Sequence, residues 1–325
     1  MGRSFTRRQV LGSAVGVAVL AGRAGATTKT AKAPKSAAKK TVPAGAAGTI
    51  TIGGDLQVNR LGFGAMRLTG QPDIWGEPAD PAEARRVLRR AVELGVNFID
   101  TADSYGPEVS ERLIAEALHP YPRGLVIATK GGLIRPSAGE WVSDGRPAHL
   151  REACEASLQR LKIERIDLYQ YHFPDPQVPL EDSLGELARL QHEGKILHIG
   201  VSNFKLAELE RARSVAQIVS VQNRYNLADR RSEDVLAMCT RDGLVFIPWA
   251  PLETGASDKL VGAQAAAADI ARAHGVSVLQ LGIAWLLAKS PAMLPIPGTS
   301  SVAHLEQNVA AAAVSLSAAE LTALS

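Results

Sequence analysis

Cysteine is scarce in this chain, and a disulfide framework is absent. The 325 residues include two cysteines. Cys154 shares a helical stripe with Leu150 and Leu158, and Cys239 shares one with Val235. Because a free cysteine behaves as a small apolar residue, we expect both thiols to be buried and unpaired. No Cys/His spacing suggests a structural metal site.

Long apolar runs are also missing. The apolar stretch from Val10 to Ala21 holds about twelve residues, too few to span a bilayer. It follows Arg7-Arg8 and precedes the small residues of 24–26, the layout of a secretory signal peptide. Thr6-Arg7-Arg8-Gln9-Val10-Leu11 resembles a twin-arginine export signal. We therefore predict a signal peptide over residues 1–26, recognised by the export machinery. We also predict no stable membrane span after cleavage, and export to the periplasm. The alternative is an uncleaved anchor or a basic tail on a cytoplasmic protein.

Acidic residues are absent from the first 47 positions, which carry nine Lys or Arg. The overall charge of +3 is therefore misleading, because the rest of the chain carries 27 basic and 33 acidic residues. Hydrophobic residues make up 46% and charged residues 21%, a globular composition. The acidic balance of the folded part argues against nucleic-acid binding. Residues 27–47 are rich in Ala, Lys, Thr and Pro, and predict a disordered linker.

Short apolar runs alternate with amphipathic segments eight times within residues 48–325, after a short hairpin over 49–58. Alternation predicts a parallel sheet with helices outside it, and eight units at this length fit a (β/α)₈ barrel. A doubly wound sheet would place a Gly-rich phosphate loop after its first strand, and Leu61 to Met66 lacks that pattern. We expect strands at residues 60–69, 96–100, 124–130, 166–171, 196–201, 218–222, 244–248 and 293–296. We expect helices at residues 81–94, 108–118, 148–161, 180–193, 205–213, 231–241, 258–274, 277–289 and 302–313.

Four polar side chains follow neighbouring strands at the points where those strands end. Asp100, Lys130 and His172 end the second, third and fourth strands, and Tyr105 lies in the loop after the second. Each also has a structural explanation by itself. Tyr105 could be a packing residue of the loop, Asp100 and Lys130 an internal ion pair, and His172 a core residue. Catalytic residues of a barrel cluster at the carboxyl ends of its strands. The shared position therefore favours a site that protonates a carbonyl as it is reduced.

Several ordered motifs accompany these four residues. They are Phe98-Ile99-Asp100-Thr101-Ala102-x-x-Tyr105-Gly106, Gly200-Val201-Ser202-Asn203-Phe204, Val221-Gln222-Asn223-x-Tyr225-Asn226, and Ile296-Pro297-Gly298-Thr299 followed by Asn308. With them the chain resembles the aldo-keto reductase family over nearly all of 48–325, and in particular a bacterial branch that includes pyridoxal reductases. The resemblance implies NAD(P)H-dependent reduction of an aldehyde or ketone to an alcohol, without a metal or a covalent intermediate.

The resemblance also implies a role for each of the four. Tyr105 would donate the proton, although a phenol with a pKa near 10 is a poor acid unless tuned. Lys130 would favour the phenolate and so strengthen Tyr105 as an acid. Asp100 would keep Lys130 charged and oriented, avoiding an unpaired buried ammonium. His172 would bind and steer the carbonyl oxygen. A purely structural Asp100–Lys130 pair is the alternative, and both roles are compatible.

Cofactor positions follow from the same resemblance. Ser202, Asn203 and Gln222 carry hydroxyl and amide groups suited to the nicotinamide carboxamide, and Trp249 would stack on its ring. The phosphates would lie at the amino end of the 302–313 helix, where free N–H groups favour anions. The remaining implied cofactor contacts are Pro251, Leu252, Gly298, Thr299, Ser300, His304, Gln307 and Asn308.

The preference for one cofactor is less well specified by the sequence. Positions where relatives often carry Lys and Arg for the 2′-phosphate read Gly298 and His304. Serine hydroxyls and helix N–H groups can still hold phosphate, so we expect NADP(H) ahead of NAD(H). The loop over 253–259 is short for a segment that closes over the cofactor.

Two loops should border the substrate pocket, Gln71 to Pro81 with Trp75 and Ile134 to Pro147 with Trp141. Loop aromatics suit a planar or apolar aldehyde, and the branch resemblance suggests a pyridoxal-like one. A non-catalytic nicotinamide-binding sensor or regulatory subunit is a second possible function. A barrel lyase or isomerase is a third, which would want a metal site or a dominant phosphate clamp.

Overall fold

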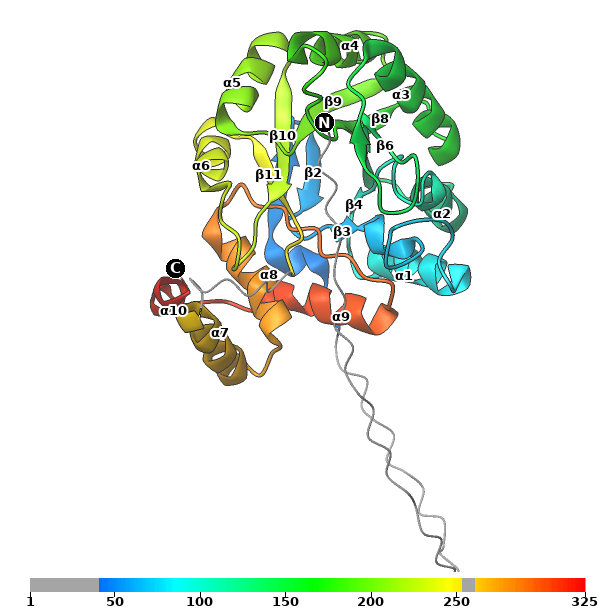
Figure 1. Ribbon diagram of the computed structural model, residues 1–325. Helices are drawn as coiled ribbons and strands as arrows, with labels where there is room; N and C mark the ends of the chain where they lie inside the picture. The colour runs from blue at the N-terminus through cyan, green and yellow to red at the C-terminus, as the bar shows by residue number, and fades with distance from the viewer. Residues whose placement is uncertain (1–40, 253–260, 325) are drawn as a thin grey trace, which may run out of the picture. The chain divides into compact units, whose positions relative to one another are not determined.

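Seven parallel strands form the wall of a barrel, and the helices lie around it (Figure 1). The computed structural model describes residues 41–252 and 261–324. Neighbouring strands follow the order β3-β4-β5-β8-β9-β10-β11, and every pair in this order is parallel. The strands are β3 (Phe63–Gly64), β4 (Phe98–Asp100), β5 (Val126–Gly131), β8 (Ile166–Tyr171), β9 (Ile196–Ser202), β10 (Ile218–Arg224) and β11 (Val245–Trp249).

The eighth unit closes the (β/α)₈ barrel with a few hydrogen bonds and an isolated bridge between Met293 and Phe246 instead of a strand, so the expectation of a strand over 293–296 was wrong. Leu294 N–H donates to Phe246 O at 2.9 Å, and Gly62 N–H donates to Pro295 O at 2.9 Å. Pro295 has no N–H with which to continue a ladder. The first strand is also shorter than expected, because residues 65–68 turn into the 3₁₀ helix η2 (Ala65–Leu68).

Local signals explain where the helices begin and end. The Asp80 side chain caps the first helix by accepting from Glu83 N–H, and Pro81 occupies its first turn. Gly95, with φ 82°, follows the end of that helix. The helices are η1 (Ala44–Ala47), α1 (Pro81–Glu93), α2 (Val109–Leu118), α3 (Pro147–Leu161), α4 (Leu180–His192), α5 (Leu206–Val215), α6 (Glu233–Asp242), α7 (Val261–His274), α8 (Val278–Lys289), α9 (Val302–Ala310), η4 (Ala311–Ala313) and α10 (Ala318–Ala323).

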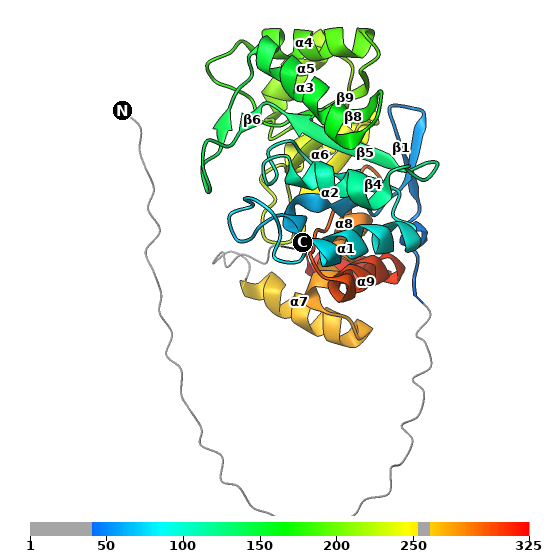
Figure 2. The same cartoon turned by 90° about the vertical axis from the view of Figure 1, so that its right-hand side faces the viewer.

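Two antiparallel hairpins lie at opposite ends of the barrel (Figure 2). One consists of β1 (Thr49–Ile52) and β2 (Leu56–Asn59), and Ile52 and Val58 from it join the apolar cluster inside the barrel. Val126 and Leu168 of the wall strands belong to the same cluster. The other hairpin, β6 (Leu133–Ile134) with β7 (Val142–Ser143), was expected to be irregular loop. The first hairpin closes the amino end and leaves the carboxyl end of the strands for a site.

The ordered chain begins before residue 48. Residues 44–47, which we assigned to the linker, form η1. Ala44 is fully buried, and its N–H donates to Leu94 O at 2.8 Å. This burial overrides the linker-like composition. The predicted signal peptide and the linker up to residue 40 lie outside the described residues.

Both cysteines are free and buried, as expected. Burial raises the pKa of each thiol to about 12, so neither is a reactive thiolate at neutral pH. Within the described residues no single helix is long and apolar enough to cross a bilayer. Only residues 266–274 and 278–289 together, bent by 95° at their break, meet that requirement.

Candidate active site at the carboxyl ends of the strands

Parallel pairing brings the four predicted catalytic residues to one rim. Asp100 is the last residue of β4, Lys130 lies next to last in β5, and His172 directly follows β8. Tyr105 lies on the loop between β4 and α2. All four side chains line the same cavity or the polar network beneath it. The structure therefore brings these four residues together, and their catalytic roles stay predictions.

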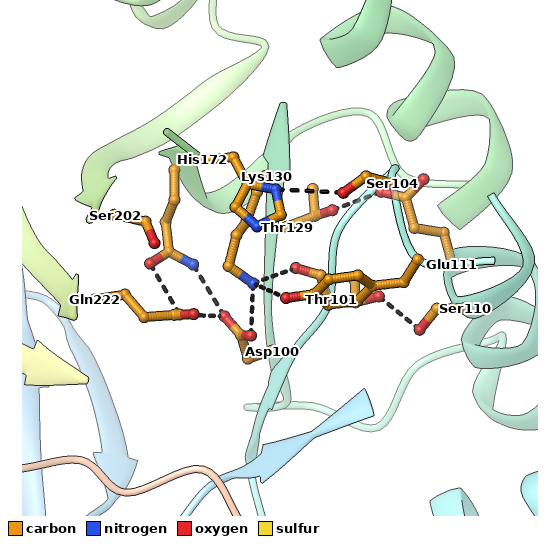
Figure 3. A network of polar contacts seen from close by, with 12 residues as sticks. Asp100, Thr101, Ser104, Ser110, Glu111, Thr129, Lys130, His172, Ser202 and Gln222 are labelled. Atoms are coloured by element: carbon orange, nitrogen blue, oxygen red, sulfur yellow. Dashed lines mark hydrogen bonds and ion pairs between the residues drawn. The ribbon is translucent and has the colours of Figure 1, made fainter. Parts of the chain in front are cut away.

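The Lys130 ammonium forms the centre of this network (Figure 3). Its Nζ donates to Asp100 Oδ1 at 2.6 Å, to Thr101 O at 2.7 Å and to Tyr105 Oη at 3.3 Å. Lys130 is completely buried and Asp100 nearly so. Three acceptors use the three N–H donors of an ammonium, which meets the requirement that a buried charge be paired and bonded.

The electrostatics keep both Tyr105 and Lys130 protonated. Burial raises the pKa of Tyr105 above its usual value, although Lys130 acts to lower it. Lys130 thus acts in the expected direction, toward the phenolate, but desolvation of the buried hydroxyl outweighs its charge. Burial acts to lower the pKa of Lys130, but Asp100 and Tyr105 outweigh it, and that pKa is raised.

His172 is held as a neutral imidazole. Burial, and then the positive charge of Lys130, lowers the pKa of His172 well below its usual value. Its Nδ1 lies 3.3 Å from Ser104 Oγ, and its ring meets the Tyr105 ring edge-on with centroids 5.8 Å apart. When the Ser104 hydroxyl donates to Nδ1, the proton of the neutral ring is on Nε2. Ser104 was missed by the sequence analysis, although it directly precedes Tyr105.

Two glutamines hold the other oxygen of Asp100. Gln222 Nε2 donates to Asp100 Oδ2 at 2.7 Å, and Gln170 Nε2 donates to the same atom at 2.9 Å. Gln222 was predicted as a cofactor contact only, and Gln170 was not predicted at all. The carboxylate that pairs with Lys130 is thus joined to Gln222, a residue that also lines the cavity.

Asn203 links the expected cofactor residues to His172. Its Nδ2 donates to His172 O at 3.0 Å and to Ser202 Oγ at 3.1 Å, and its Oδ1 accepts from Trp249 Nε1 at 3.0 Å. Asn203 has a left-handed backbone with φ 63°, and so does Ala250 beside Trp249, with φ 52°. Such conformations cost free energy outside glycine and gather at functional sites.

A cavity of about 520 Å³ opens at this rim. It lies within the size range of small-molecule sites. Most of its lining is apolar, and the rest offers hydroxyl, amide and ionisable groups. The lining residues are Gly64, Met66, Arg67, Asp100, Tyr105, Leu133, Trp141, His172, Ser202, Asn203, Gln222, Trp249, Ala250, Pro251, Leu252, Ile296 and Gly298.

The remaining predicted cofactor residues lie outside this lining. They are Thr299, Ser300, His304, Gln307 and Asn308. Ser300 and His304 are exposed at the amino end of α9. There the N–H of Val302 donates to Glu83 Oε1 at 3.2 Å. A carboxylate thus occupies part of the position at which we expected a phosphate.

A second cavity, of about 550 Å³, lies at the opposite end of the barrel beside the turn of the β1–β2 hairpin. Its charged residues, Arg213 and Asp242, pair with each other. This is the amino-terminal face of the barrel, where residues serve stability and not catalysis. Among the described residues no group of three or more His, Cys, Asp or Glu side chains is arranged to hold a metal ion.

Comparison with known proteins agrees with this geometry. Residues 60–325 match the model of the aldo/keto reductase family. The chain belongs to the aldo/keto reductase family. It is 49% identical to an uncharacterised oxidoreductase of Schizosaccharomyces pombe over 87% of this chain and 90% of that one. It is 41% identical to pyridoxine 4-dehydrogenase of Escherichia coli over 85% of this chain and 96% of that protein.

Solved aldo-keto reductases have the same fold. A thermostable aldo-keto reductase in complex with the inhibitor epalrestat matches 85% of this chain with a TM-score of 0.75 and 32% identity, and 98% of its own length is covered. An aldo-keto reductase of Klebsiella pneumoniae in complex with NADPH matches 85% of this chain and 93% of its own, with a TM-score of 0.71 and 28% identity. Family membership makes this chain an NAD(P)H-dependent oxidoreductase and supports carbonyl reduction.

The residues of this aldo/keto reductase fit a nicotinamide group. Ser202, Asn203 and Gln222 offer hydroxyl and amide groups to the cavity that Tyr105 lines. Trp249 lines the same cavity and donates to Asn203 Oδ1. These groups would hold the carboxamide and the flat ring, respectively. The loop over 253–259, which we expected to be too short to close over the cofactor, lies outside the described residues.

Proposed function

We propose that this chain reduces an aldehyde to an alcohol with NADP(H) in preference to NAD(H), and that Tyr105 is the proton donor. The observation that carries the proposal is the buried line from Asp100 through Lys130 to the Tyr105 hydroxyl, with bonds of 2.6 and 3.3 Å. The hydroxyl end of this line reaches a cavity that also contains His172. Bound NAD(P)H would supply the hydride to the carbonyl carbon.

Each side chain then has a distinct task. His172, neutral and carrying its proton on Nε2, donates to the carbonyl oxygen and orients it. Tyr105 gives its proton to that oxygen as negative charge develops, and the product is the alcohol. Lys130 stabilises the phenolate that remains until water reprotonates it. General acid catalysis of this kind contributes roughly 10²–10⁴-fold in rate.

A planar aldehyde of the pyridoxal type is the proposed substrate class. The cavity lining includes the apolar side chains of Met66, Leu133 and Trp141. The similar Escherichia coli protein is a pyridoxine 4-dehydrogenase. A flat aromatic aldehyde would lie against the Trp141 ring while its carbonyl reaches Tyr105.

Preference for NADP(H) is supported by relatives crystallised with NADPH or NADP. The Glu83 carboxylate at the amino end of α9 opposes it. Comparing the Kd of the purified chain for NADPH and for NADH tests this part of the proposal, and a lower Kd for NADH would overturn it.

Deuteride transfer tests the function directly. The full-length chain is incubated with pyridoxal and NADPH deuterated at the transferable position. We expect an alcohol that carries deuterium on the former carbonyl carbon. NADPH that binds without reducing pyridoxal, p-nitrobenzaldehyde or propanal would contradict the proposal and favour a sensor or regulatory subunit.

We further propose that the chain is exported with its predicted signal peptide over residues 1–26. The twin-arginine-like segment carries this proposal. N-terminal sequencing of the protein from a periplasmic fraction tests it. A mature protein that begins near residue 27 is expected, and an intact N-terminus confined to the cytoplasm would overturn it.

A further inference from the structure

Arg135 and Trp141 face each other across the β6–β7 hairpin. The pairing of Leu133 with Ser143 and of Ile134 with Val142 brings Arg135 opposite Trp141 when it is continued by one residue. Side chains that oppose each other in an antiparallel pair share a face. The guanidinium carbon of Arg135 accordingly lies 3.7 Å from the centroid of the Trp141 ring.

The Arg135 guanidinium also joins three separate loops. Four of its bonds go to backbone carbonyls, from the hairpin, from the segment after η2 and from the loop that carries Tyr105. They run from Nε to Glu140 O at 2.9 Å, from Nη1 to Ile74 O at 3.0 Å and to Ser104 O at 3.3 Å, and from Nη2 to Asp73 O at 2.8 Å. Arg135 is 8% exposed, so the bonds are shielded from water.

Lysine could not replace this arginine. A guanidinium has five N–H donors in a planar fork and can stack on an indole at the same time, whereas an ammonium is a compact point charge. Trp75, which lies 5.5 Å from the guanidinium of Arg135, flanks it from the second loop. Trp75 is 39% and Trp141 37% exposed. The buried guanidinium therefore holds the three loops together, and the two indole rings lie between it and solvent.

Trp141 connects this anchor to the reacting end of the cavity. Its ring meets the Tyr105 ring edge-on, with centroids 6.4 Å apart and an interplanar angle of 73°. It lines the cavity beside Leu133, and Tyr105 and His172 lie within the same lining. Moving the Trp141 ring would therefore widen the space in front of the Tyr105 hydroxyl without touching the Lys130 network.

We propose that Arg135 is a positioning residue that fixes Trp141 as one wall of the carbonyl pocket and thereby selects flat aromatic aldehydes over small aliphatic ones. This inference rests on the proposed carbonyl reduction. Arg135 does not touch the reacting atoms. It acts through Trp141, whose stacked position determines how a flat ring is held against Tyr105.

The test compares two aldehydes in the full-length chain. In Arg135→Ala, KM for p-nitrobenzaldehyde should rise about tenfold while kcat changes little, because binding loses its oriented wall. KM for propanal should stay near the wild-type value, because propanal does not need that wall. Arg135→Lys should behave as Arg135→Ala does. Equal losses for both aldehydes would show general loosening and overturn the proposal.

Two further variants make the result specific. Trp141→Leu should reproduce the selective loss, and the double variant with Arg135→Ala should lose little more, because the two residues act as one unit. Fully additive losses would contradict the inference. Arg112→Ala is the matched control: it breaks an exposed pair with Glu77 in the segment after η2, and should leave the ratio of the two aldehydes unchanged.

A binding measurement separates this inference from the proposed function. The Kd of p-nitrobenzoate for the protein saturated with NADP should also rise about tenfold in Arg135→Ala. An unchanged Kd would overturn the role of Arg135. Absence of aldehyde turnover in the wild type, with the Kd effect present, would instead overturn the proposed reaction and leave Arg135 as the residue that positions the pocket wall.

Discussion

The Tyr105 end of the cavity is buried and bonded, whereas the amino end of α9 is exposed and its Glu83 carboxylate is also paired with Arg86. Lys130, Asp100 and Gln170 are 2% exposed or less and bond to one another or to a shared partner. At α9, Ser300 and His304 face solvent, and Glu83 accepts from the helix N–H of Val302. Under the proposed function, proton donation would depend on the buried strand ends, whereas the choice between NADPH and NADH would depend on a few exposed groups at α9.

Removing the ammonium should have the largest effect at the buried end. Lys130→Met leaves Asp100 Oδ1 without its closest partner and Tyr105 without its stabilising charge. We expect kcat to fall by roughly 10³-fold and the free energy of unfolding to fall by roughly 3–5 kcal/mol. Steady-state kinetics and urea unfolding measure the two effects.

The double variant Asp100→Asn/Lys130→Met is the control for stability. It removes both members of the buried pair, so part of the lost free energy of unfolding should return, while activity stays low. A Lys130→Met enzyme with near-normal kcat would break the proposed link between the buried network and proton transfer.

A smaller effect is expected at Ser104. Ser104→Ala removes the hydroxyl that lies 3.3 Å from His172 Nδ1 and that, as donor to it, would place the ring proton on Nε2, so kcat/KM should fall roughly tenfold. Ser110→Ala provides the matched control, because Ser110 is an equally buried serine that bonds to Thr101 and does not contact His172. Equal kcat/KM values for the two variants would contradict the role of Ser104.

The exposed end should respond to a single charge. Glu83→Gln removes a carboxylate from the amino end of α9, so Kd for NADPH should fall by roughly two- to fivefold, as expected for one charge at a helix terminus. Kd for NADH should change less. Glu93→Gln, at the other end of α1 and paired with Arg90, should change neither Kd. A higher Kd for NADPH in Glu83→Gln would mean that this carboxylate helps to bind the cofactor.

The smallest effect is expected from moderate changes of pH. Burial and Lys130 lower the pKa of His172, so the imidazole stays neutral as the pH falls toward 6.5. Burial raises the pKa of Tyr105, so its proton stays bound as the pH rises toward 10. We therefore expect kcat/KM to be flat from about pH 6.5 to about pH 10. A halving of kcat/KM as the pH falls to about 6.5 would show that His172 titrates near its ordinary pKa.

The lowered pKa of His172 also makes the free energy of unfolding depend on pH. Below about pH 6.5 the unfolded chain protonates the His172 side chain while the folded protein does not. The contribution of His172 is therefore present above that pH and is lost as the pH falls. His172→Gln should reduce the slope of unfolding free energy against pH in this range.

The sequence predicted that the candidate catalytic residues meet at one rim, because polar residues that end parallel strands must meet at one edge. This rule alone was enough to predict the positions of Asp100, Lys130 and His172. It could not predict the roles of Ser104, Gln170 and Arg135, because these depend on partners up to 70 residues away that no local pattern specifies. The direction in which the pKa of Tyr105 shifts could not be predicted from the sequence either, because desolvation of the hydroxyl depends on packing.

The errors in the fold have local physical causes. Residues 293–296 look like a strand by composition, but Pro295 lacks the N–H for a continuous ladder. Residues 44–47 look like a linker, but Ala44 is buried and its N–H donates to the carbonyl of Leu94, directly after α1. The β6–β7 hairpin was missed because its strands have two residues each, too few for an alternating pattern.

The central claim is that Tyr105 donates the proton from within the Lys130 network. The direct test is Tyr105→Phe, measured by single-turnover reduction of p-nitrobenzaldehyde and by the Kd for NADPH. We expect the rate to fall by roughly 10²–10⁴-fold while Kd stays within about twofold of wild type, because the ring and its packing are kept. A Tyr105→Phe enzyme that reduces the aldehyde at the wild-type rate would contradict the account.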